Sequence, residues 1–355
     1  LVALWLYATC DGVGSAHEVE RLCQAHDAYR WICGGVAVNY HTLSDFRSAH
    51  PAALDELLTQ LIAVLMHEGL VVLKRVAQDG TRVRASAGAG SFRRRQRLED
   101  FVTAAREQVE AVKAQANAPT DTQRNARRAA AQQRAARDRA ERVQRTLEEL
   151  ERIEQQREAM TGGHQPKGQP RASTTDPEAR KMKMGDGGFR PAFNAQLATD
   201  TESRVIVGVA LTAEGTDYAQ SAPMLEQVEK RTGKKLEEVL LDGGYVSKEA
   251  VDAISEHSVT MYAPLPERKG TPDPLAIKPQ DSAAMQALKE RMGSDVGKAI
   301  YKERAATAET VNADLKTWRS LDRFLVRGTR KVTCVLLWNV LAYNILRWVA
   351  LTAVS

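Results

Sequence analysis

The stretch Leu236–Tyr245 reads Leu-Glu-Glu-Val-Leu-Leu-Asp-Gly-Gly-Tyr, and its pattern decides the fold. Residues 236–241 predict a strand, and the two glycines after Asp242 predict a turn directly behind it. Open α/β sheets bind their ligands at the edge where such strands end. Because glycine lets the backbone turn away, we expect the Asp242 carboxylate to be exposed at that edge.

A second strand, predicted over Gly69–Gln78, ends in the same way at Asp79-Gly80-Thr81. Two further strands, over 193–199 and 205–211, are predicted to form a hairpin. A predicted helix over 221–232 follows this hairpin, and another over 248–257 follows the strand that ends before Asp242. Taken alone, each Asp-Gly sequence is also a common turn. Their order along the chain, however, predicts an α/β fold with a ribonuclease H-like mixed-sheet core.

Helical segments precede and interrupt this core. Residues 1–67 have apolar residues at helical spacing and tight turns, which is typical of a small DNA-binding domain or of a helical packing domain. Residues 92–160 are rich in Ala, Arg, Gln and Glu, and a break at 117–121 predicts a long antiparallel helical hairpin. The predicted fold is therefore an α/β core with an N-terminal helical domain and a long helical-hairpin insertion.

The second predicted helix of the hairpin carries a local excess of positive charge. Between Arg124 and Arg145 there are eight Arg residues and two acidic residues, which gives a local net charge of +6. Such a patch suits a phosphate backbone, with Arg124, Arg127 and Arg128 as candidate DNA-binding residues. A solvated helix face with i, i+4 ion pairs explains the same pattern equally well.

These observations predict the following organisation of the chain. Residues 1–67 form the N-terminal helical domain, 68–91 the first strand of the catalytic core, 92–160 the helical hairpin insertion, 161–192 a loop, and 193–355 the remainder of the core with the C-terminal helices.

Composition limits the classes of protein that fit. The 355 residues carry a net charge of +5, which permits a polyanionic partner without establishing one. Four cysteines without a Cys-x-x-Cys pair argue against a zinc ribbon or a dense disulfide scaffold and favour a reducing compartment. No signal peptide is predicted. Polar residues interrupt the apolar stretch 332–355, which favours a buried helix over a membrane span.

The helix predicted over 301–316 carries the most specific local pattern. At about 100° per residue, its chemically useful side chains fall within roughly 140° of arc. They are Tyr301, Arg304, Glu309, Asn312 and Lys316. One face thus presents an aromatic ring, two cations and a carboxylate. Glu303 and Asp314 lie on the same helix, but the helical phase favours Glu309 as the third carboxylate.

Three carboxylates at one site suit the cleavage of phosphodiester bonds. The reaction must neutralise charge on phosphorus and activate a water or hydroxyl. Two divalent cations about 4 Å apart do both, and they prefer oxygen ligands. Without metal ions, carboxylates this close repel one another, which raises the pKa of one of them.

The sequence resembles the DDE transposases of bacterial insertion sequences, in the branch with a Tyr-Arg-Glu-Lys signature. The matching strings, in order along nearly the whole chain, are Tyr40–Arg47, Asp79–Thr81, Ser173–Arg180, Phe193–Gln196, Asp242–Tyr245, Tyr301–Lys316 and Phe324–Gly328. The broader pattern often has three residues between its Arg and Glu, whereas this sequence has four. The family protein normally begins upstream of residue 1, so we expect the DNA-binding domain to be incomplete here.

The resemblance implies roles for the quoted residues. Asp79, Asp242 and Glu309 are expected to be catalytic and to bind two Mg²⁺ or Mn²⁺ ions. Tyr301, Arg304 and Lys316 are expected to contact the transposon end.

It also implies an activity and its partners. A DNA transposase would cleave strands at transposon ends and transfer them into target DNA, as a homodimer on double-stranded DNA in the bacterial cytoplasm, without a membrane partner. A catalytically inactive DNA-binding relative is the alternative, and a helical scaffold that assembles through residues 92–160 is a third hypothesis.

Overall fold

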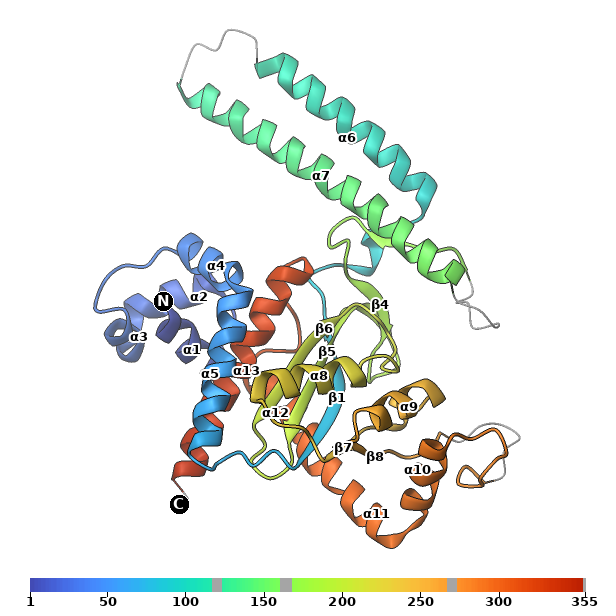
Figure 1. The fold of residues 1–355 in the computed structure, drawn as a ribbon. Coiled ribbons are helices and arrows are strands. Elements are labelled where there is room, and N and C mark those ends of the chain that lie inside the picture. The colour runs from blue at the N-terminus through green and yellow to red at the C-terminus, as the bar shows by residue number, and fades with distance from the viewer. Residues whose placement is uncertain (117–122, 160–167, 267–272, 354–355) are drawn as a thin grey trace. The chain divides into compact units, whose positions relative to one another are not determined.

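The computed structural model describes residues 1–116, 123–159, 168–266 and 273–353. The chain divides into two compact units (Figure 1). Unit 1 comprises residues 1–84 and 193–355, and unit 2 comprises residues 85–192. Strand β5 (Phe189–Asp200) contributes its first residues to unit 2 and the rest to unit 1.

Unit 1 is built around a mixed sheet with the strand order β6-β5-β1-β7-β8. The strands not yet introduced are β1 (Arg75–Arg84), β6 (Ile206–Thr212), β7 (Glu238–Leu240) and β8 (Thr260–Tyr262). Strand β7 pairs in parallel with both β1 and β8, whereas β5 and β6 form an antiparallel hairpin. This sheet and its helices confirm the predicted α/β class with a ribonuclease H-like fold.

Helices cover the sheet and bring the C-terminal half of the chain onto it. They are α8 (Ser221–Thr232), α9 (Lys248–Glu256), α10 (Ala283–Gly293), α11 (Asp295–Tyr301) and α12 (Thr310–Trp318). Helix α8 packs on β6, while α9 and α10 pack on β8. A π turn over Ala305–Glu309 packs on β1 and thereby places the segment between α11 and α12 beside the central strand.

Five N-terminal helices lie beside the last helix of unit 1, α13 (Thr329–Thr352): the first, fourth and fifth pack on α13, whereas the second and third pack on each other and on their N-terminal neighbours. They are α1 (Val2–Cys10), α2 (Ala16–Ala25), α3 (Asp27–Ile32), α4 (Tyr40–Ala49) and α5 (Pro51–His67). Helix α13 is long and apolar enough to cross a membrane, but 61% of its most apolar window is buried. It contacts α1, α4, α5 and β6, as a core helix does.

Unit 2 contains the two long helices α6 (Arg95–Ala116) and α7 (Gln123–Ala159). They run antiparallel, since Arg95 near the start of α6 pairs with Glu154 near the end of α7. Leu98, Leu150 and Ile153 form their apolar contact at that end. The predicted break at 117–121 lies within residues 117–122, which are outside the described residues.

Two predicted elements differ from the structure. The apolar stretch at 70–73 is not a strand, because Leu73 adopts a φ of +63°, and the strand begins only at Arg75. Residues 161–192, predicted as a loop, contain β3 (Ala172–Ser173) and β4 (Arg180–Lys183), and β5 begins within them. Strand β3 pairs with β2 (Phe92–Arg93), which is distant in sequence, whereas β4 forms a local antiparallel hairpin with the start of β5.

Candidate active site

Asp79 lies in the middle of β1 rather than behind the strand, which corrects the sequence-based placement. Its side chain is 17% exposed, and both carboxylate oxygens accept hydrogen bonds. Arg304 Nη2 and the Gly80 amide donate to Oδ1 at 2.9 and 3.0 Å, and Asn312 Nδ2 donates to Oδ2 at 2.9 Å. The π turn and α12 thus reach the central strand at this carboxylate.

Asp242 lies where the sequence predicts it, just beyond β7. It caps a 3₁₀ turn over Gly243–Tyr245, with Oδ1 accepting the Gly244 amide at 2.6 Å. Strand β1 is paired with β7 through Ala77 and Leu240, so Asp79 and Asp242 each follow that pair by two residues. Parallel pairing therefore brings the two carboxylates to one edge.

Glu309 reaches this edge because the helix between Tyr301 and Thr310 is not a regular α-helix. The turn Ala305–Glu309 is a π-helix, in which residues five apart are hydrogen-bonded neighbours. Arg304 and Glu309 are five apart, and an α-helix would separate them by about 140°. The π turn accommodates the additional residue that the sequence has between them.

Arg304 is the cation shared by all three carboxylates. Its Nη2 lies 2.9 Å from Asp79 Oδ1 and 3.9 Å from Asp242 Oδ2, and its Nη1 lies 3.7 Å from Glu309 Oε1. The Arg304 side chain is 10% exposed, whereas those of Asp242 and Glu309 are 41% and 65% exposed. The site therefore opens from a buried carboxylate toward two that solvent reaches.

The remaining residues of the signature lie around the same site. Burial raises the pKa of Tyr301, and Arg304 beside it opposes that shift. Burial lowers the pKa of Lys316, which Asp79 opposes by stabilising the charged ammonium. The structure therefore places Tyr301 and Lys316 near the carboxylates. Arg304, the third predicted DNA contact, forms ion pairs with the carboxylates themselves.

Burial raises the pKa of Asp79 to about 6, the negative charge of Asp242 adds to the shift, and Arg304 opposes it. An acid with a raised pKa retains its proton in the native state after the unfolded chain has lost it. Stability is therefore lost as the pH rises from about 4 to above 6. We expect this carboxyl to remove roughly 3 kcal/mol of unfolding free energy across that window in EDTA.

Urea unfolding between pH 4 and 8 would measure this effect by comparing wild type with Asp79→Asn. The difference in stability between the two proteins should change across the window, whereas Asp295→Asn, at an exposed position, should show no such change. A constant difference would contradict the raised pKa.

The donor set fits divalent cations in its chemistry. Carboxylate oxygens are the ligands that Mg²⁺ and Mn²⁺ prefer, and here three carboxylates already converge on one positive group. In this structure the three carboxylates are arranged around the Arg304 guanidinium rather than around a metal ion. Among the described residues, no three His, Cys, Asp or Glu side chains are positioned to hold an ion without adjustment.

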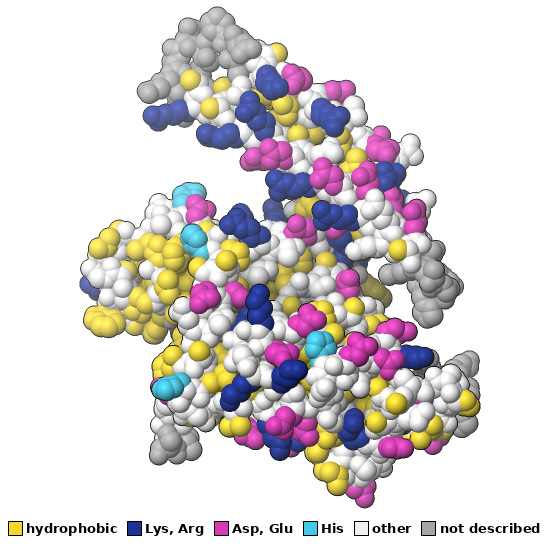
Figure 2. Space-filling view, viewed as in Figure 1, with side chains coloured by type: hydrophobic (Ala, Val, Ile, Leu, Met, Phe, Trp, Pro, Cys, Tyr) yellow, Lys and Arg dark blue, Asp and Glu magenta, His cyan; other side chains and the backbone are white. Residues whose placement is uncertain are grey.

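The predicted DNA-binding arginines of the hairpin lie in unit 2, on α7. Arg127 and Arg128 are exposed, and the side chain of Arg124 lies outside the described residues. Within the described part of this Arg-rich run, Arg145 pairs with Glu141, and the other arginines have no carboxylate within 4 Å. Figure 2 shows basic side chains along the hairpin of unit 2, with acidic side chains among them.

A group of polar residues buried behind Asp79 has no role predicted from the sequence. Asn194 and Gln196 on β5 are 1% and 0% exposed, and both donate to Asp217 Oδ1, at 2.7 and 2.6 Å. The signal was present in the sequence, because two amides at alternate positions of an apolar strand point to the same face. Gln78 and Tyr245 complete this group by bonding to Gln196.

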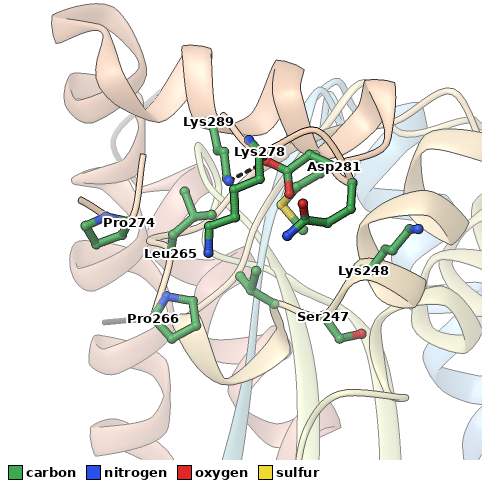
Figure 3. A pocket seen from close by; sticks show the side chains of 11 residues that line it. Ser247, Lys248, Leu265, Pro266, Pro274, Lys278, Asp281 and Lys289 are labelled. Atoms are coloured by element: carbon green, nitrogen blue, oxygen red, sulfur yellow. Dashed lines mark hydrogen bonds and ion pairs between the residues drawn. The ribbon is translucent and has the colours of Figure 1, made fainter. Parts of the chain in front are cut away.

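A separate cavity of about 230 Å³ lies between the start of α9 and the segment before α10 (Figure 3). Ser247 and Lys248 line one side of it, and Lys278, Asp281 and Lys289 line the other. Lys289 forms an ion pair with Asp281, at 2.5 Å, and donates a hydrogen bond to the Ala276 carbonyl. The three candidate carboxylates do not line this cavity, so it is separate from the candidate active site.

Comparison with known proteins agrees with the geometry. Residues 161–345 match the family described as Transposase DDE domain. No curated protein and no solved structure matched the chain. The match includes Asp242 and Glu309 and spans more than half of the sequence. The chain therefore belongs to the DDE transposase family.

Proposed function

We propose that this protein is an active transposase that cleaves DNA strands at transposon ends and transfers them into target DNA. Family membership implies DNA as the substrate. The observation that carries the proposal is the convergence of Asp79, Asp242 and Glu309, from three separate segments, on a single cation at the sheet edge.

In this proposal, the three carboxylates hold two Mg²⁺ or Mn²⁺ ions. When bound, such ions stabilise charge on the phosphate and lower the pKa of a coordinated water or hydroxyl. Asp79 must be ionised to serve as a ligand, and Asn312 fixes the direction of its Oδ2. Asp242 is fixed by the Gly244 amide, whereas Glu309 is exposed enough to adjust.

Arg304 has two successive roles in this mechanism. It neutralises the carboxylates before metal binds, through its three ion pairs with them. Divalent cations would replace that charge, so the guanidinium would become available to a DNA phosphate, for which its planar donors are suited. Tyr301 and Lys316 would contact the same DNA strand from the same helical segment.

The test is cleavage of supercoiled plasmid and labelled duplex DNA with Mg²⁺, Mn²⁺ or EDTA. We expect nicked and joined products with either metal and none in EDTA. DNA binding without cleavage under all metal conditions would instead support the catalytically inactive relative. The retention of all three carboxylates at one site favours the active protein.

We further propose that the hairpin of unit 2 binds the DNA backbone through the described arginines of α7 from Arg127 to Arg142, which have no carboxylate within 4 Å among the described residues. Removing one ion pair between an arginine and a DNA phosphate reduces the slope of log affinity against log salt by about 0.9. Replacing Arg127 and Arg128 together with Ala should therefore reduce that slope and weaken binding to any sequence. A salt titration by fluorescence anisotropy measures both effects.

The matched control is Arg152→Ala, on the same helix, where the arginine pairs with Glu149 at 3.3 Å. It should leave the slope nearly unchanged. An unchanged slope in the double variant, with altered sedimentation, would instead assign the hairpin to dimerisation. Because two transposon ends must be joined, we expect a homodimer on DNA, acting in the bacterial cytoplasm.

A further inference from the structure

Behind the carboxylates, one buried amide connects the strand that carries Asp79 with the turn that Asp242 begins. Gln196 Oε1 accepts hydrogen bonds from the Tyr245 hydroxyl at 2.5 Å and from Gln78 Nε2 at 3.2 Å. Gln78 immediately precedes Asp79, and Tyr245 ends the turn that Asp242 begins. A single oxygen atom therefore contacts both segments.

Alternation along β1 places this amide on the opposite side of the strand from the carboxylate. Successive side chains of a strand point to opposite faces, so Gln78 points away from Asp79. Gln78 Nε2 also donates to the Gln220 carbonyl before α8, whereas Asp79 is bonded from the π turn and α12. Gln196 thus acts on the backbone that carries Asp79 and does not touch the carboxylate.

Asp217 determines which end of the Gln196 amide faces which partner. An ionised carboxylate only accepts hydrogen bonds, so the Gln196 group 2.6 Å from Asp217 Oδ1 must be Nε2. The oxygen Oε1 is then directed toward Tyr245 and Gln78. Asn194 also donates to Asp217 Oδ1, at 2.7 Å, and fixes that carboxylate in turn.

The close approach of this group also explains the glycine after Asp79. A β-carbon at Gly80 would lie 2.3 Å from Gln196 Nε2 and 2.5 Å from Asp217 Oδ1. Its φ is not in the left-handed region, so the glycine here provides space rather than a turn. The glycine after Asp79 is therefore explained by the close packing of the Gln196 amide against β1.

We propose that Gln196, oriented by Asp217, is a positioning residue that sets the separation of the Asp79 and Asp242 carboxylates for metal binding. This inference rests on the proposed function. Polar groups behind metal ligands commonly contribute roughly 10–100-fold to metal affinity or activity. The distance between two carboxylates on different strands is sensitive to a small backbone shift, since a misplacement of about 1 Å can cost roughly 100-fold in rate.

The decisive test is a charge exchange within this pair. Gln196→Glu places a second negative oxygen against Asp217 and should weaken Mn²⁺ binding by roughly 10–100-fold. Asp217→Asn alone retains an acceptor and should have a small effect. The double variant restores one donor and one acceptor across the contact, and it should recover most of the affinity.

Mn²⁺ affinity would be measured by electron paramagnetic resonance, together with kcat and KM for plasmid nicking and urea unfolding in EDTA. We expect Gln196→Glu to lower kcat with little change in KM for DNA. The matched control is Gln227→Glu, because Gln227 bonds at both ends to the backbone of Val209, away from the site. Gln196→Met, which removes all three hydrogen bonds of the Gln196 side chain, provides a second variant.

Failure to recover in the double variant, or equal effects at Gln196 and Gln227, would overturn the positioning role. Asp242→Asn serves as the reference. If Asp242→Asn loses Mn²⁺ binding and nicking while the Gln196 variants resemble Gln227→Glu, only this inference fails. If Asp242→Asn retains both, the proposed function fails and the positioning role fails with it.

Discussion

Replacing Asp242 with Asn is expected to reduce metal-dependent DNA cleavage and strand joining by a factor on the order of 10³. The substitution keeps the shape of the side chain and its hydrogen bond from Gly244, but it removes the negative charge that a divalent cation requires. Asp242 is 41% exposed, so the fold should be little affected. Labelled duplex and plasmid substrates would measure both reaction steps.

The control for this prediction is Asp295→Asn, which removes one negative charge from an exposed position at the start of α11. It should cleave at the wild-type rate. Both variants should bind DNA within a few-fold of wild type. Cleavage by Asp242→Asn at the wild-type rate would remove Asp242 from the proposed catalytic site.

Replacing Arg304 with Met is expected to have the largest effect on stability in the absence of metal. It leaves the buried Asp79 carboxylate without its cation, and breaking one partner of such a buried pair costs roughly 3–5 kcal/mol. Exposure of Asp242 and Glu309 to solvent favours the lower end of that range. Urea unfolding in EDTA at pH 8 would measure it.

Two conditions should reduce this loss. Mn²⁺ should restore stability by binding the folded state, and lower pH should restore it by protonating Asp79. Arg21→Met is the control, because its ion pair with Glu18 is exposed and should contribute little. Equal stability of Arg304→Met and wild type in EDTA would show that the carboxylates do not depend on the arginine.

The sequence contains enough information to predict the fold class and to nominate the residues at the sheet edge. The prediction of a strand ending before Asp242 needs only a short apolar run and two glycines, which are local signals. The helix of Glu309 has a recognisable face for the same reason. The positions of Asp242 and of the Glu309 helix could therefore be predicted, because short patterns of neighbouring residues determine them.

The features that the sequence did not reveal depend on distant partners. Strand β1 begins at Arg75 because its pairing with β7 and the turn at Leu73 outweigh the apolar run before it. The π turn could not be predicted from the local sequence, because it depends on the contact between Arg304 and Asp79 on the distant strand β1. Gln196 has its role through Tyr245, 49 positions away, which no local pattern indicates.

The central claim is that Asp79, Asp242 and Glu309 hold divalent metal ions, and iron-directed cleavage of the protein chain tests it most directly. Fe²⁺ bound at the site generates hydroxyl radicals with ascorbate and peroxide, and mass spectrometry locates the backbone cuts. We expect cuts near these three residues, suppressed by excess Mg²⁺ and absent in Asp79→Asn. Cuts confined to other segments, or cuts near the three residues that persist in Asp79→Asn, would contradict the claim.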